Sequence, residues 1–154
     1  MQNDFQTNLI KGKIAELVFQ QMFAEAGKYT ILPLGYERVL PGLLDWHNND
    51  ILKPIRSAPD FVLIPKDEKD ENILIVEVKF RTHITLEDNL ERATEQNKRW
   101  NPSYMFVATL ERFYFGKCVE IIEKHGMMGE LNDAYASVDM QKKYLNILKE
   151  FLDK

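Results

Sequence analysis

Three charged residues stand in two segments that otherwise read as buried strands. Residues 60–64 read DFVLI and residues 72–80 read NILIVEVKF, so Asp60 opens the first segment while Glu77 and Lys79 interrupt the second. Carboxylate oxygens are ligands that Mg²⁺ and Mn²⁺ prefer, and a lysine beside such an ion can orient or deprotonate a water molecule. These residue types suit a metal-dependent hydrolytic site, provided that the fold brings them together.

The two segments are joined by the short charged stretch PKDEKDE, which predicts a hairpin. If Pro65 lies opposite Asn72, Asp60 lies opposite Glu77, on one face of the sheet, and their Cβ atoms are roughly 5 Å apart. A slip of one residue would send the two acids to opposite faces. Carboxylates this close repel, so either one stays protonated or a divalent cation lies between them.

The competing interpretation is an ordinary solvated surface, which is the usual setting of a Glu-x-Lys at a strand end. Two observations favour a site. The segment around Glu77 is apolar on both faces, and the residue opposite it is an acid, where a lysine would have paired with it more simply.

The remaining elements follow from periodicity. Apolar spacing predicts a helix over 9–26, with Thr7 and Asn8 available to cap its start and Gly27 just past its end. The other expected elements are a strand within 29–40 interrupted by Pro33 and Gly35, a loop over 41–57, a helix over 86–100, strands over 103–110 and 118–122, and an amphipathic helix over 139–152. This order predicts an α/β fold with a mixed sheet flanked by helices.

Composition restricts the class of protein. The chain has 154 residues, 45% of them apolar, which predicts one domain with its own core. The net charge of −4 argues against a protein that coats nucleic acid through a broad basic surface. Cys118 is the only cysteine and is expected to be a small buried residue. Without a secretion signal or a membrane-length apolar run, we expect a cytoplasmic protein that does not bind membranes.

The pair Pro59–Asp60 followed by Glu77–Val78–Lys79 resembles the PD-(D/E)XK nuclease superfamily, which includes restriction endonucleases and Holliday junction resolvases. The resemblance covers roughly residues 9–110 and implies a restriction endonuclease-like α-β-β-β-α-β core, with residues 111–154 as an extension that either completes the core or forms a homodimer face. It implies that Asp60, Glu77 and the backbone carbonyl of Val78 bind Mg²⁺ or Mn²⁺ and that Lys79 acts on the attacking water.

The resemblance also suggests residues on two helices. Glu16 on the first helix would face the site, although it could equally be a surface acid, and Gln96 on the second helix would point at it. The basic candidates for holding a phosphate backbone are Lys13, Arg56, Arg81, Lys98 and Arg99, with Lys11, Lys53 and His83 as further possibilities. Trp46 and His47 in the 41–57 loop either contact bases or, as we favour, pack the loop onto the core.

The expected activity is therefore Mg²⁺-dependent hydrolysis of nucleic-acid phosphodiester bonds, with DNA as the first candidate. The residues leave open DNA against RNA, and duplex against junction or single strand. The alternatives are a catalytically inactive module of the same fold that binds nucleic acid or protein, and a plain structural α/β domain in which the assumed register is wrong.

Overall fold

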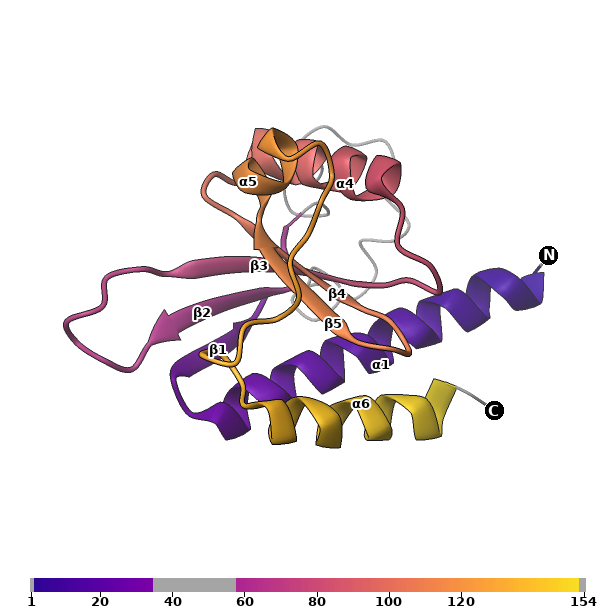
Figure 1. Cartoon of the computed structure of the whole chain (residues 1–154), viewed down its shortest axis with the longest axis horizontal. Helices are drawn as coiled ribbons and strands as arrows, with labels where there is room; N and C mark the ends of the chain where they lie inside the picture. Colours follow the sequence, from indigo (N-terminus) through magenta and orange to yellow (C-terminus); the bar gives the residue numbers. More distant parts are fainter. Residues whose placement is uncertain (1, 35–57, 153–154) are drawn as a thin grey trace.

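The computed structural model of the chain describes residues 2–34 and 58–152. Within these ranges, helices cover a five-stranded sheet on both faces (Figure 1). In chain order the elements are α1 (Gln2–Ala26), β1 (Tyr29–Pro33), β2 (Phe61–Pro65), β3 (Leu74–Phe80), α4 (Leu86–Arg99), β4 (Tyr104–Ala108), β5 (Phe113–Lys117), α5 (Cys118–Glu123) and α6 (Val138–Leu152). The predicted α/β class and the order helix, three strands, helix, strand are confirmed.

The sheet is mixed, and its strands lie in the order β1-β2-β3-β4-β5. Antiparallel pairing joins β1 to β2, β2 to β3 and β4 to β5, whereas β3 and β4 run parallel. A parallel pair needs a crossover connection, and α4 provides it between β3 and β4. The segment that ends β3 and begins α4 therefore passes along the edge of the sheet where β3 finishes.

The core consists of two apolar clusters, one on each side of the sheet. Helices α1 and α6 cover one face, where the ring of Phe19 packs on Phe61 and Phe106 with centroid distances of 5.1 and 4.9 Å. Helices α4 and α5 cover the other face (Figure 1), where Ala93 and Ile121 belong to a smaller cluster. This packing presses α1 along the sheet and places its residues close to β3.

The C-terminal helix completes the core. Tyr144 and Leu148 of α6 are buried in the cluster that also contains α1. Of the two roles expected for the extension, the structure shows this one, and a homodimer face stays a prediction. None of the helices in the described ranges is long and apolar enough to cross a membrane.

The predicted start of the first helix was wrong. We expected Thr7 and Asn8 to cap a helix beginning at residue 9, but α1 begins at Gln2 and both residues lie inside it. Polar residues such as Gln, Asn and Asp obscure apolar periodicity in this first stretch without preventing a helix. The end of the helix agrees with the prediction, since Gly27 follows it with a φ of 75°, in the left-handed region that favours glycine.

The strand predicted over 118–122 was also wrong. This segment is the short helix α5, in which Cys118 and Ile121 are buried one turn apart. The strand lies directly before it, as β5, where Phe113 and Phe115 alternate with more exposed residues. Short apolar runs with β-branched residues suit a strand or one buried helical turn, so periodicity alone does not separate them. As expected, Cys118 is buried.

The strand expected within 29–40 is found as β1, which ends at Pro33. Residues 35–40 and the loop predicted over 41–57 lie outside the described residues.

Candidate active site

The pairing of β2 with β3 has the register that the hairpin predicted. Phe61 lies opposite Val76, and Leu63 lies opposite Leu74. Extending this register by one residue places Asp60, which directly precedes β2, opposite Glu77. The juxtaposition of the two acids therefore follows from the observed register, which is the one that the sequence predicted.

Asp60 forms hydrogen bonds to both neighbouring segments at the end of the β2–β3 pair. Its Oδ2 atom accepts a hydrogen bond of 2.8 Å from the backbone N–H of Val78, two residues beyond Val76, the last residue of β3 that is paired with β2. The backbone carbonyl of Asp60 accepts from Leu34 N at 2.8 Å, on the side of β1. Contacts to both neighbouring segments hold this carboxylate in one position beside β3.

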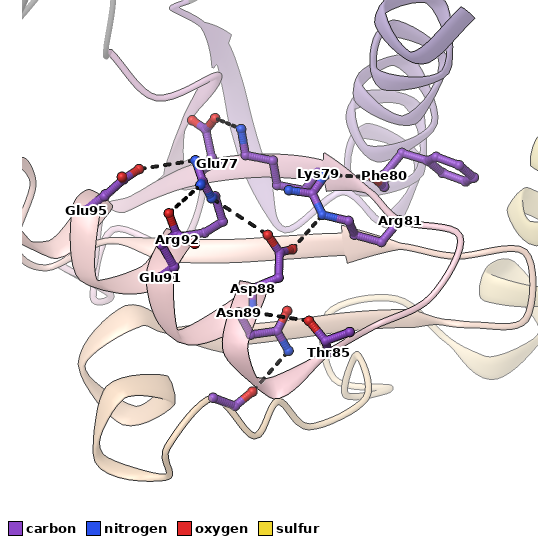
Figure 2. A network of polar contacts seen from close by, with 11 residues as sticks. Glu77, Lys79, Phe80, Arg81, Thr85, Asp88, Asn89, Glu91, Arg92 and Glu95 are labelled. Carbon is purple, nitrogen blue, oxygen red and sulfur yellow. Dashed lines mark hydrogen bonds and ion pairs between the residues drawn. The ribbon is translucent and has the colours of Figure 1, made fainter. Parts of the chain in front are cut away.

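Glu77 and Lys79 lie two residues apart on β3 and therefore share a face of the sheet. Lys79 Nζ lies 2.9 Å from Glu77 Oε1, and the two side chains are 30% and 18% exposed, respectively (Figure 2). Leu74, Val76 and Val78 alternate with them and are buried in the α1 cluster. The charged pair thus stands on a strand that is anchored by the apolar residues between them.

A cavity of about 500 Å³ brings these residues together with α1. The sequence-predicted residues that line it are Lys13, Glu16, Asp60, Glu77, Val78, Lys79 and Arg81. From α1, Lys13 Nζ lies 3.2 Å from Glu16 Oε2, and the Glu16 side chain is only 13% exposed. Glu16 is therefore a lining residue of the cavity and not an ordinary surface acid.

The acids in this cavity disturb the protonation of Asp60. Burial, first, and then the charges of Glu77 and Glu16 raise the pKa of the Asp60 carboxyl from 3.8 to about 8, and hydrogen bonding with the Glu16 side chain acts in the same direction. The hydrogen bond from Val78 N–H opposes the shift. In the metal-free protein at neutral pH, Asp60 is thus mainly protonated, which is one of the two ways in which crowded carboxylates can coexist.

The donor chemistry of the cavity fits a hard divalent cation. The side chains of Asp60 and Glu77 offer carboxylate oxygens, and a positive ion near them would remove the repulsion that raises the pKa of Asp60. Over residues 2–34 and 58–152, no group of three or more His, Cys, Asp or Glu side chains is arranged to hold a metal. A bound ion would accordingly rely on these two carboxylates together with backbone and solvent oxygens.

Other predicted residues lie away from the cavity. Gln96 lies on the buried face of α4, where its Nε2 has no hydrogen-bond partner, and it is not among the lining residues. Lys98 and Arg99 are exposed in the last turn of α4 and do not line the cavity either. Further predicted residues lie outside the described ranges, namely Trp46, His47, Lys53 and Arg56.

The sequence analysis missed several residues that line the cavity. Asn8, Leu9 and Gly12 join Lys13 and Glu16 on one face of α1, and Phe80 and Thr82 lie at the end of β3. The spacing of residues 9, 12, 13 and 16 is that of one helical face, so the signal was present. Asn8 was interpreted as a cap, and no role was assigned to Leu9 or Gly12.

A part-buried set of polar contacts fixes Arg81 beside the cavity. Arg81 Nε donates to Asp88 Oδ2 at 2.6 Å, and Arg81 Nη1 donates to the carbonyl of Phe80 at 2.9 Å (Figure 2). Asp88 stands in the first turn of α4, and Thr85 caps that helix by accepting from Asp88 N. The guanidinium is therefore held by two bonds at the edge of the cavity.

No protein-family model matches the chain, and no curated protein is significantly similar to it.

Proposed function

We propose that the protein is a metal-dependent nuclease with a restriction endonuclease-like core, which hydrolyses phosphodiester bonds in nucleic acid, DNA in the first instance. One observation carries the proposal: Asp60 and Glu77 oppose each other in register, with Lys79 and Glu16 in the same cavity. Without a chemical role, a stable sheet would gain by replacing one of these crowded acids.

In this proposal Asp60 and Glu77 hold Mg²⁺ or Mn²⁺, with the Val78 carbonyl as the expected further ligand. The ion would supply Lewis acidity, which lowers the pKa of a water molecule and stabilises negative charge on the phosphate. Lys79, now paired with Glu77, is placed to orient that water and to offset charge at the phosphate. Glu16 lies near Asp60 and influences its protonation.

Two cationic side chains that line the cavity are the candidates for phosphate binding. Lys13 comes from α1 and Arg81 from the end of β3, so they approach the acids from different elements. A guanidinium held by Asp88 can present its remaining N–H groups to a phosphate at little conformational cost. Contacts of this kind position the backbone without reading sequence.

A second candidate is an inactive module of the same fold that works through binding. Its support is electrostatic: the net charge is −4, and Lys13, Lys79 and Arg81 each contact a carboxylate within the protein. The retained set of two acids and a lysine favours the enzyme, because a binding module does not need it.

Cleavage assays on the single variants Asp60→Ala, Glu77→Ala and Lys79→Ala test the proposal. We expect wild type to cut plasmid, branched or single-stranded DNA in Mg²⁺ or Mn²⁺ and to be inactive in EDTA. Each variant should lose at least about 100-fold in rate, since each removes a metal ligand or the group that acts on the water. Glu130→Ala, which removes an exposed acid outside the cavity, is the control and should keep full activity.

Inactivity of wild type on every substrate, combined with no heat of Mg²⁺ or Mn²⁺ binding in calorimetry, would exclude the nuclease. Metal binding without cleavage would favour the inactive module.

A further inference from the structure

We infer that the cavity binds one unpaired strand of nucleic acid and discriminates against a continuous duplex, an inference that rests on the proposed function. Its first support is the charge of the cavity. Within residues 2–34 and 58–152, three cations and three acids line it, and each of these cations contacts a carboxylate. A duplex-binding surface relies on many basic contacts to phosphates, and the lining residues that the structure describes offer three.

The charges on the surface of α4 also argue against the binding of a duplex. Arg92, in the middle of α4, contacts Asp88, Glu91 and Glu95, and the last two acids are more than half exposed (Figure 2), whereas Lys98 and Arg99 are exposed in the last turn of the helix. The charge of Arg92 is thus neutralised within the helix. A duplex lying across the middle of this helix would place its phosphates against the exposed carboxylates of Glu91 and Glu95, which is unfavourable.

The second support is an apolar portion of the cavity that suits a base. Leu9, which is 56% exposed, and Phe80 both line it, and Lys11 Nζ lies 5.9 Å from the centroid of the Phe80 ring. Proteins that bind single strands combine a few cations with aromatic and apolar surfaces on which bases stack. A base inside a duplex would have to leave its stack to reach such a surface.

Gly12 is the third support. It lies inside α1, where glycine costs roughly 1 kcal/mol of helix stability relative to alanine. A Cβ atom added at this position would meet nothing within 4 Å, and Gly12 lines the open cavity. Glycine at such a site keeps the volume free and allows a ligand to approach the helix backbone. The cavity volume of about 500 Å³ is in the range that holds one compact ligand.

Together these features place a phosphate between the acids and the cations, with its neighbouring base against Leu9 and Phe80. The substrates expected from this arrangement are single strands, flaps and frayed ends.

Binding measurements in Ca²⁺ test this arrangement separately from cleavage. Ca²⁺ takes the same oxygen ligands as Mg²⁺, and a gel confirms that the oligonucleotide stays intact. Fluorescence anisotropy with a labelled 12-nucleotide DNA strand, and with the blunt duplex of the same sequence, should give at least tenfold tighter binding of the single strand. With three cations in contact, the logarithm of affinity should fall with the logarithm of salt concentration at a slope of about −2.

Two variants probe the cavity, and a third is the matched control. Leu9→Ala should weaken single-strand binding about fivefold through loss of apolar contact. Gly12→Leu should keep the thermal stability of wild type, since it adds a helix-favouring residue in open space, and should weaken binding more than tenfold. Leu17→Ala removes a leucine that is equally exposed on the same helix but faces the groove between α1 and α6, so it should change nothing.

Equal or tighter binding of the duplex would overturn the inference, as would equal effects of Leu9→Ala and Leu17→Ala. If the wild-type protein gave one of these results but still nicked duplex plasmid in Mg²⁺, the proposed nuclease activity would be supported. Only the inferred preference for a single strand would then be wrong. If the single strand binds in a way that depends on Leu9 but no substrate is cleaved, the inference that the cavity binds an unpaired strand would stand. The proposal that the protein is a nuclease would then be rejected.

Discussion

At the scale of single residues, the main feature is a carboxyl group that the fold keeps from ionising. Asp60 is part-buried, lies opposite Glu77, and accepts a hydrogen bond from Val78 N–H. Burial and the neighbouring acids outweigh that hydrogen bond and raise the pKa of Asp60 to about 8. Such a group destabilises the folded protein whenever it must be charged, which is a cost that a structural residue would avoid.

This raised pKa predicts how stability depends on pH. Between about pH 4 and 8, folded Asp60 keeps a proton that the unfolded chain has released, so the free energy of unfolding should fall as pH rises, by at most about 1.4 kcal/mol per pH unit. In Asp60→Asn this contribution is absent. Urea unfolding in EDTA over pH 4.5–8 measures the free energy of unfolding of wild type and Asp60→Asn as a function of pH. The exposed Asp67→Asn is the control, and an identical pH dependence in Asp60→Asn and wild type would contradict the assignment.

At the scale of elements, the site lies at the end of β3, before the chain reaches α4. The cavity takes residues from one face of α1, from the residues before β2 and from the end of β3. Arg81 is the link to α4, because Asp88 in the first turn of that helix holds its guanidinium. A displacement of α4 would therefore move a cation that borders the cavity.

Asp88 is accordingly predicted to be a positioning residue. In Asp88→Asn, Arg81 loses a charge-assisted bond and samples other orientations, so KM for the nucleic-acid substrate should rise about three- to tenfold with little change in kcat. Glu87→Gln is the matched control, since it removes a neighbouring first-turn acid that also favours the helix N-terminus but does not contact Arg81. Steady-state cleavage kinetics of the two variants measure kcat and KM. Equal changes in KM for Asp88→Asn and Glu87→Gln would show that Asp88 acts only through the stability of the helix.

At the scale of the whole molecule, the protein combines an acidic chain with one small, charge-balanced cavity. Helices α1 and α6 form an apolar support on one face of the sheet, and α4 and α5 cover the other face. These layers hold the strands that carry the acids, so a cation bound between the acids would stabilise the entire fold.

Thermal unfolding should therefore respond to Mg²⁺ in a way that depends on pH. At an ion concentration 100 times its Kd the stabilisation would be about 2.7 kcal/mol, and each kcal/mol raises Tm by about 2–4 °C in a chain of this size. The shift should be larger at pH 8 than at pH 5.5, because at the lower pH the ion must displace the proton on Asp60. Calorimetric scans would show the shift in wild type and Glu130→Gln but not in Glu77→Gln. An unchanged Tm in wild type at both pH values would contradict the metal site.

The sequence by itself determined the pairing of Asp60 with Glu77 and the position of Lys79 beside them. These features depend on local rules, since a short hairpin sets the register and alternation along a strand sets the face. It also indicated the element order and the α/β class, because apolar periodicity is a local property as well.

Only the tertiary structure decided which distant residues join the acids. Glu16, Leu9 and Gly12 face the cavity because aromatic packing of α1 against the sheet orients the helix. The same packing of elements left Gln96 outside the cavity and brought Asp88 to Arg81. Helix orientation depends on contacts between residues far apart in the chain, and no local pattern contains that information.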